Sequence, residues 1–295
     1  MRSAARTGAL MAMCSMLTVQ IGLAAAVGLI DDLGAGGTAW LRLVWAGVIF
    51  LLVGRPWRLR FSRQAFVACV LLGLATGGVT LLFMQAVARL PLGMASALEF
   101  LGPLGVAVAR SDRAQGSRRL LWPLLAAIGV VLLTRPWSGT ADPVGVAFAL
   151  AAACCWAAYI LMTQRVGDEV AGIGGLAVSM PVAAVLATLV AGPATLPRMT
   201  PELWLVGLGL AILLPAVPFT LELLALRRLN TSAFGTLMSL EPAFALLVGF
   251  VVLSQTPGLL AIAGIGFVVV AGIGAERTGA RTRDEVSEPV ATLVP

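Results

Sequence analysis

Apolar stretches of about twenty residues follow one another along nearly the whole chain, separated by short polar or basic turns. Because a helix needs about 20 predominantly apolar residues to cross the hydrocarbon core of a bilayer, this pattern predicts membrane-spanning helices. The polar turns divide the chain into ten spans, so the predicted fold class is an all-α polytopic membrane protein. The spans are Gly8–Ile30, Thr38–Val53, Ala65–Ala88, Leu92–Ala109, Arg119–Thr134, Val144–Thr163, Val170–Ala191, Glu202–Leu226, Thr231–Leu253 and Gly258–Ala275.

The two halves of the chain resemble each other. Leu90–Pro103 reads LPLGMASALEFLGP and Leu229–Pro242 reads LNTSAFGTLMSLEP, and a shift of 139 positions pairs their first leucines and their last prolines. The first repeat is expected at residues 1–137 and the second at residues 138–276, with residues 277–295 as a disordered, charged tail. Because five spans per repeat is an odd number, the second repeat enters the membrane from the opposite face. The sequence therefore predicts two inverted five-helix repeats.

The arginines set the expected orientation. The chain has 20 basic residues, all of them arginine, and a net charge of +6. With the amino terminus inside the cell, sixteen arginines fall on the inner side, whereas Arg89, Arg135 and Arg198 fall outside and Arg42 lies within a span. This asymmetry follows the positive-inside rule, so both termini are expected in the cytoplasm. Because the arginines are scattered between apolar spans, nucleic acid is not an expected partner.

Two carboxylates, Glu99 and Glu241, fall near the middle of predicted spans. An ionised side chain at the bilayer centre costs about 2.5–3.5 kcal/mol even on the lenient insertion scale, so such residues usually face a cavity and have a function. Pro103 and Pro242 follow them closely, and each removes one helix hydrogen bond and leaves a free backbone carbonyl. We expect both acids to bind substrate or protons. The alternatives are close helix packing around Glu99 and a structural hydrogen bond of Glu241 at the proline kink.

Other polar or aromatic side chains within the spans are weaker candidates. The expected contacts of a substrate cavity are Gln20, Tyr159, Trp156, Thr80 and Ser239. The expected gating or secondary residues are Glu222, Arg42 and Gln85. Arg42 lies one turn from the outer end of its predicted span and could extend to the membrane interface. Glu222 lies near the inner end of span eight, close to Arg227 and Arg228.

The composition argues against several functional classes. The chain contains no histidine, which removes the usual metal ligand and the commonest general base. Its four cysteines form no CxxC pair, so neither a zinc site nor a redox site is expected. There is also no HExxH motif and no glycine-rich phosphate loop. No metal, no cofactor and no enzymatic activity are therefore expected, although a membrane-embedded enzyme remains the alternative from another class.

Five segments of the chain carry recognisable motifs: PWRLRF at 56–61, PLGMASALEFLGPL at 91–104, CWAAYIL at 155–161, LELLALRRL at 221–229 and FGTLMSLEP at 234–242. These motifs resemble the drug/metabolite transporter superfamily in its EamA-type branch, and within it the threonine/homoserine exporter group of bacterial inner membranes. The resemblance implies proton-coupled export of small amino acids such as threonine and homoserine, by alternating access around a cavity at the midplane. Glu99, Glu222, Glu241 and Tyr159 lie in these motifs, and Gln20 lies in the first span, which the resemblance also covers.

Two questions stay open at this point. A broad exporter of drugs or aromatic metabolites is the alternative function, although cavities for such substrates favour many aromatic side chains and this chain has 11 Phe, 7 Trp and 1 Tyr. The oligomeric state could be a monomer or a homodimer. The expected partners are a small amino acid, protons and the lipid bilayer.

Overall fold

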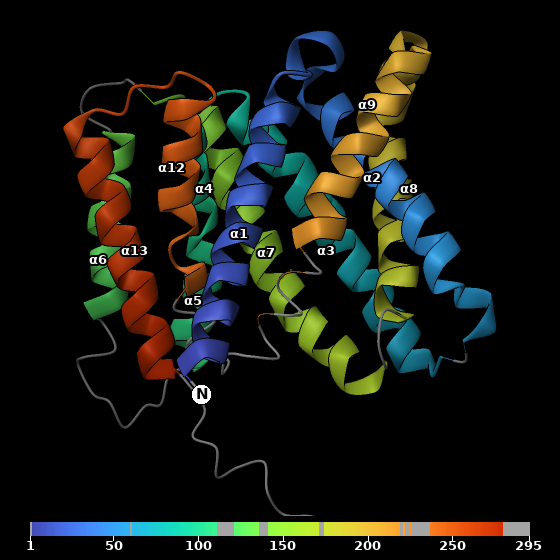
Figure 1. Ribbon diagram of the computed structural model, residues 1–295, viewed down its shortest axis with the longest axis horizontal. Helices are drawn as coiled ribbons and strands as arrows, with labels where there is room; N and C mark the ends of the chain where they lie inside the picture. Colours follow the sequence, from blue (N-terminus) through green and yellow to red (C-terminus); the bar gives the residue numbers. More distant parts are fainter. Residues whose placement is uncertain are drawn as a thin grey trace, which may run out of the picture.

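The described part of the chain is helical and contains no strand (Figure 1). The computed structural model describes residues 2–59, 61–110, 121–135, 141–170, 174–218 and 237–279, together with Leu221 and Ala225. Glu222 lies outside the described residues, as do the start of the predicted ninth span and most of the predicted carboxy-terminal tail.

The helices occur in the order that the hydrophobic pattern predicts. The first half contains α1 (Arg2–Val27), α2 (Ile30–Gly54), α3 (Arg63–Val87), α4 (Leu92–Glu99), α5 (Leu101–Arg110) and α6 (Leu121–Thr134). The second half contains α7 (Pro143–Glu169), α8 (Gly174–Thr195), α9 (Pro201–Ala211), α12 (Glu241–Val251) and α13 (Leu259–Gly279). Short 3₁₀ turns lie at Pro56–Arg58 and Leu196–Arg198, and a π-helical turn, Ile212–Ala216, continues α9.

Five of the described helical segments are long and apolar enough to cross a membrane. They are Arg6–Val27, Ile30–Arg58, Arg63–Val87, Pro143–Thr163 and Gly174–Arg198. Shorter apolar helices accompany them at Leu92–Val106, Leu121–Thr134, Pro201–Leu214, Glu241–Val251 and Leu259–Gly274. The chain is therefore an all-helical, multi-pass membrane protein.

The predicted fourth span, Leu92–Ala109, contains a one-residue turn at Phe100 that separates α4 from α5, although Phe100 keeps right-handed helical φ and ψ (−62° and −14°). Pro103 has no N–H to donate to the carbonyl of Glu99, and its ring clashes with that carbonyl, so a regular helix cannot continue through this point. A turn at Ser239–Leu240 precedes α12 in the same way, with Pro242 two residues beyond it. Phe100 and Ser239 are 139 positions apart, so both breaks occur at the same position of the sequence repeat.

The predicted start of the second span at Thr38 is wrong. Helix α2 begins at Ile30, where Asp31 and Asp32 occupy its first turn and interact favourably with the positive end of the helix dipole. Gly34 has a φ of 72°, which glycine adopts without a steric penalty, and it bends the helix there. Arg42 consequently lies midway along this 25-residue element.

Helices at matching positions of the two halves pack against each other. Helix α2 contacts α8, α4 contacts α12 and α6 contacts α13, and these pairs stand side by side across the bundle (Figure 1). Small residues allow the close approach that membrane helices use in place of a hydrophobic driving force. A Cβ on Gly47 of α2 would lie 2.7 Å from the Cβ of Ala184 on α8, and one on Gly129 of α6 would lie 2.7 Å from the carbonyl oxygen of Gly264 on α13.

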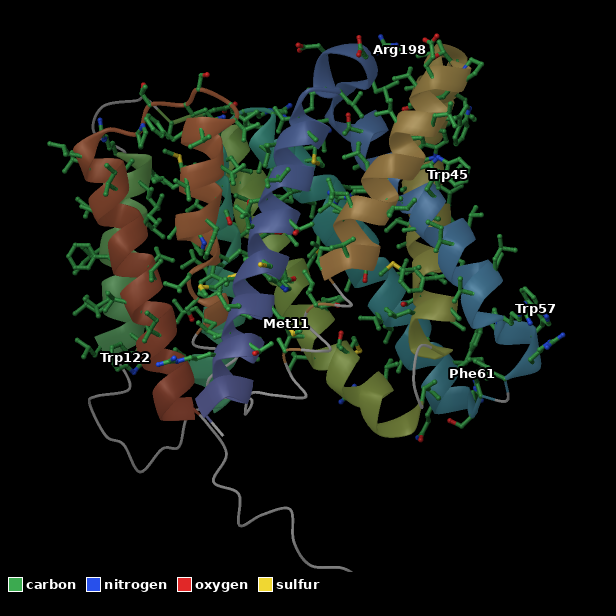
Figure 2. All side chains as sticks on the ribbon, viewed as in Figure 1. Met11, Trp45, Trp57, Phe61, Trp122 and Arg198 are labelled. Atoms are coloured by element: carbon green, nitrogen blue, oxygen red, sulfur yellow. The ribbon has the colours of Figure 1, made fainter. Side chains whose placement is uncertain are left out.

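The helix ends fall on two sides of the bundle. The amino terminus, Trp57 and Phe61 lie toward one end, and Arg198 lies at the opposite end (Figures 1 and 2). Helix α1 begins at the first of these ends. Helix α7 also terminates there, because Gly174, which follows it, packs against Leu59. The first helices of the two sequence repeats therefore run in opposite directions.

Asp142 joins the two halves at the start of α7. Its carboxylate accepts a hydrogen bond from the Val144 N–H (2.9 Å) and lies 3.8 Å from the guanidinium of Arg89. Asp142→Ala is expected to lower the free energy of unfolding by about 1 kcal/mol through loss of the helix cap. Asp142→Asn keeps the capping oxygen and loses only a half-exposed ion pair, which contributes less than about 1 kcal/mol. Thermal unfolding in detergent should therefore rank Ala below Asn, and the reverse order would contradict the capping role.

Candidate functional site

Glu99 is the last residue of α4 and lies directly before the break in the helix. Its side chain is 7% exposed and receives no hydrogen bond from the described part of the chain. It lies close enough to Glu241 and Arg42 to interact with both electrostatically. The fold therefore places a carboxylate inside the helix bundle, beside one charge of each sign.

Glu241 is the first residue of α12 and follows the matching break in the second half. Its Oε1 accepts a hydrogen bond from Nε2 of Gln20 on α1 (3.3 Å). Gln20 is completely buried, and its own Oε1 is buried without a hydrogen-bond partner among the described residues. The two acids are thus brought together by the packing of α4 on α12 and are joined by a glutamine from the first helix.

Arg42 belongs to the same region. Its Nη1 is buried and has no hydrogen-bond partner in the described part of the chain, and no ion pair within 4.0 Å joins the guanidinium to Glu99 there. A buried Nη1 near Glu99 favours a place for Arg42 inside the bundle rather than at the membrane interface. Arg42 lies midway along α2, beyond the kink at Gly34, and close enough to Glu99 to interact with it electrostatically.

Aromatic and small residues surround the two breaks. The ring of Phe100 packs edge to face against Trp156 of α7, with centroids 6.3 Å apart. A Cβ on Gly272 of α13 would lie 2.6 Å from the Phe100 ring and 2.9 Å from Oγ of Ser239. The predicted residues Trp156 and Ser239 therefore lie at the breaks, whereas Phe100 was missed. A signal for Phe100 was its position between Glu99 and Pro103.

Three other predicted residues lie at different places. Tyr159 packs in the apolar cluster of Cys69, Val166 and neighbours from α3, α7 and α8. Gln85 accepts a hydrogen bond from Arg89 Nη1 (2.7 Å) at the end of α3. Thr80 is buried on α3, 6% exposed. No contact that we describe joins these three to the acids, so their role in a substrate cavity stays a prediction.

Two apolar grooves open on the outside of the bundle. One, of about 670 Å³, runs between α2 and α9 along Trp45 and Trp204, and the other, of about 530 Å³, runs between α5 and α7 along Gly105 and Cys154. Neither groove is lined by Glu99, Glu241, Gln20 or Arg42. The polar cluster therefore lies inside the bundle, apart from both grooves.

Known proteins resemble this chain along most of its length. The chain is 36% identical over 271 residues to the threonine/homoserine exporter RhtA of Escherichia coli (strain K12). This alignment covers 90% of this chain and 89% of that protein. The RhtA protein of Salmonella typhimurium (strain SL1344) is 36% identical over 276 residues, 91% of each chain. The sequence profile of the EamA-like transporter family matches residues 143–274. The chain belongs to the EamA-like transporter family.

The fold of this EamA-like transporter also occurs among solved structures. A crystal structure superimposes on it with a TM-score of 0.58 at 18% sequence identity, and the match covers 91% of this chain and 96% of the other. At that identity the likeness concerns the fold alone. The predicted resemblance to EamA-type transporters is confirmed by the family match and by the similarity to RhtA.

Proposed function

We propose that this EamA-like transporter is a secondary-active exporter of small amino acids similar to threonine and homoserine, driven by the proton gradient. The single observation that carries the proposal is the pairing of a buried Glu99 with a partly buried Glu241 at two matching helix breaks. Its relatives are named as threonine/homoserine exporters, and they cover about nine-tenths of the chain. The same relatives support a place in the bacterial inner membrane and a role other than catalysis.

Carboxylates held in low dielectric suit this role. An unpaired ionised carboxylate inside a membrane protein is unfavourable. Binding of a proton or of a substrate ammonium neutralises the charge and therefore stabilises the site. Glu99 and Glu241 also repel each other when both are ionised. A proton and an amino acid therefore compete for one site, and this competition couples inward proton movement to outward substrate movement.

The broken helices support alternating access around this site. Secondary transporters with inverted repeats bind their substrates near the midplane, at discontinuous helices, and expose the site to each side by rocking one bundle against the other. Here the breaks lie at matching positions of the two halves, and α1 and α7 run in opposite directions. We infer ten spans in two inverted repeats, with both termini in the cytoplasm.

Efflux from proteoliposomes tests the function. Purified protein is reconstituted, the vesicles are loaded with labelled L-threonine or L-homoserine, and an inward proton gradient is imposed. Efflux should accelerate under the gradient and should return to the rate of protein-free vesicles when an ionophore collapses it. Efflux that is unaffected by the gradient would contradict proton coupling. Inhibition by aromatic compounds but not by small amino acids would indicate a broad drug exporter.

A further inference from the structure

The side chain of Arg42 has no assigned role in the exchange of a proton for an ammonium group. We propose that the Arg42 guanidinium binds the carboxylate of the substrate, so that the site selects zwitterionic amino acids over simple amines; this inference rests on the proposed export function. It assigns the two ends of the substrate to different helices: the carboxylate to α2, and the ammonium to α1, α4 and α12.

The first observation is a buried donor without an acceptor. Arg42 Nη1 is inaccessible to solvent, and the described part of the chain offers it no hydrogen-bond partner. A guanidinium carries five N–H donors in a fixed fork, accepts no hydrogen bond and stays charged in proteins. Leaving such a donor unpaired in a buried site is unfavourable, and a carboxylate matches its geometry with two parallel hydrogen bonds.

The second observation is a buried acceptor without a donor. Gln20 donates from Nε2 to Glu241, and because an ionised carboxylate only accepts hydrogen bonds, this contact fixes the orientation of the amide. Gln20 Oε1 is then left as a buried acceptor with no partner in the described part of the chain. Together with the carboxylates of Glu99 and Glu241, it forms a set of acceptors suited to the three N–H donors of an ammonium group.

The third observation is that opposite charges lie near each other without pairing. Arg42 and Glu99 interact electrostatically, yet no ion pair within 4.0 Å joins them in the described structure. An α-amino acid carries its ammonium and its carboxylate on the same carbon atom. It can therefore place the ammonium against the acids and the carboxylate against Arg42. An amine without the carboxylate would leave the Arg42 donor unpaired, and sites built to bond a polar group discriminate strongly against ligands that lack it.

The test compares acids with their amides. Equilibrium binding of L-threonine, L-homoserine and their primary amides is measured on the purified protein in detergent; the amides keep the ammonium and lose the charged carboxylate. The wild-type protein should bind the acids about 10- to 100-fold more tightly than the amides. Arg42→Gln should weaken binding of the acids by a similar factor and leave the amides nearly unchanged, so that the preference disappears.

Two further variants make the result specific. Arg42→Lys keeps the charge and loses the planar fork, so it should retain part of the preference. Arg198→Gln removes an exposed arginine at the end of the bundle and should leave the binding of acids and amides unchanged (Figure 2). If Arg42→Gln does not fold, as judged by gel filtration, Arg42→Lys carries the test through its reduced preference.

Several outcomes would overturn the proposal. The wild-type protein could bind amides as tightly as acids or bind neither, the Arg42 variants could keep the full preference, or Arg42→Gln could weaken both ligand classes equally, as a purely charge-balancing arginine would. The efflux assay separates this failure from failure of the proposed function. Gradient-driven efflux without a preference for acids removes the carboxylate site and keeps the exporter. If the wild type prefers acids and Arg42→Gln abolishes that preference, but no gradient-driven efflux is seen, the carboxylate site is kept and the proton-driven exporter is removed.

Discussion

Glu99→Gln is expected to reduce gradient-driven efflux to the rate of protein-free vesicles, while the protein still folds and inserts. Glutamine has nearly the shape of glutamate but cannot bind and release a proton, so the step that couples the gradient to the substrate is lost. The fold should tolerate the change because a neutral amide is less unfavourable than a carboxylate in a site that is only 7% exposed. The measurement is efflux of labelled amino acid from proteoliposomes with an imposed pH gradient, alongside thermal unfolding of the same preparation.

A matched control is available in Glu202→Gln. Glu202 is an exposed glutamate in the first turn of α9, and none of the contacts described for the polar cluster involves it. This variant should export at the wild-type rate. Normal export by Glu99→Gln would remove Glu99 from the mechanism, and an equal loss in both variants would show that the effect is not specific to the buried site.

Gly102→Ala is expected to destabilise the protein more than any other glycine-to-alanine change on α5. A Cβ at this position would collide with the backbone carbonyl of Ala153 on α7, and a backbone atom cannot move aside as a flexible side chain can. Overpacking of this kind typically costs about 1–3 kcal/mol, which corresponds to a fall in melting temperature of roughly 3–10 °C. Phe100 lies directly before α5 and packs against Trp156 of α7. A shift between α5 and α7 should disturb this contact, so export should fall as well.

Gly105→Ala on the same helix is the control. Gly105 is exposed, and a Cβ there would meet no atom within 4 Å. Alanine is the better helix former by about 1 kcal/mol, so this variant should have an unchanged or slightly higher melting temperature. Equal melting temperatures for the two variants would contradict the close approach of α5 to α7.

The sequence predicted the special positions of the repeat but not their geometry. Pro103 and Pro242 are 139 positions apart, which is the shift between the two repeats. They indicated that both halves depart from a regular helix at the same depth. The sequence did not show that the fourth span would be interrupted by a turn at Phe100. A proline can bend a helix or end it, and the result depends on what packs around it, here Trp156 and Gly272.

Arg42 shows a second limit of the sequence. The glycines and acids before Thr38 interrupt the apolar pattern, so the hydrophobic signal places the start of the span too late. In the fold, Gly37 packs so closely on Thr195 of α8 that a Cβ would lie 2.8 Å from Oγ1. This long-range contact accompanies an element that begins eight residues earlier and is kinked at Gly34, and the contact is invisible to periodicity.

The polar side chains of the predicted spans lie in two kinds of place in the fold, inside the bundle or near a helix end. Their positions inside apolar spans identified Glu99, Glu241 and Gln20 as unusual. The packing of α1, α4 and α12 brings these three side chains together. Gln85 looked equivalent in the sequence, yet it bonds to Arg89 near the end of α3. Whether a polar side chain faces its own helix end or a partner across the bundle is decided by tertiary packing, which one sequence does not encode locally.

Proton release on substrate binding tests the central claim most directly, which is that a proton and an amino acid compete for the Glu99–Glu241 site. Wild-type protein in weakly buffered detergent solution is titrated with L-threonine while a pH indicator reports released protons. Linkage between the two ligands predicts release of up to about one proton per bound amino acid, varying with pH, and none from Glu99→Gln. Saturable binding that releases no proton at any pH, or the same release from Glu99→Gln as from the wild type, would contradict the account.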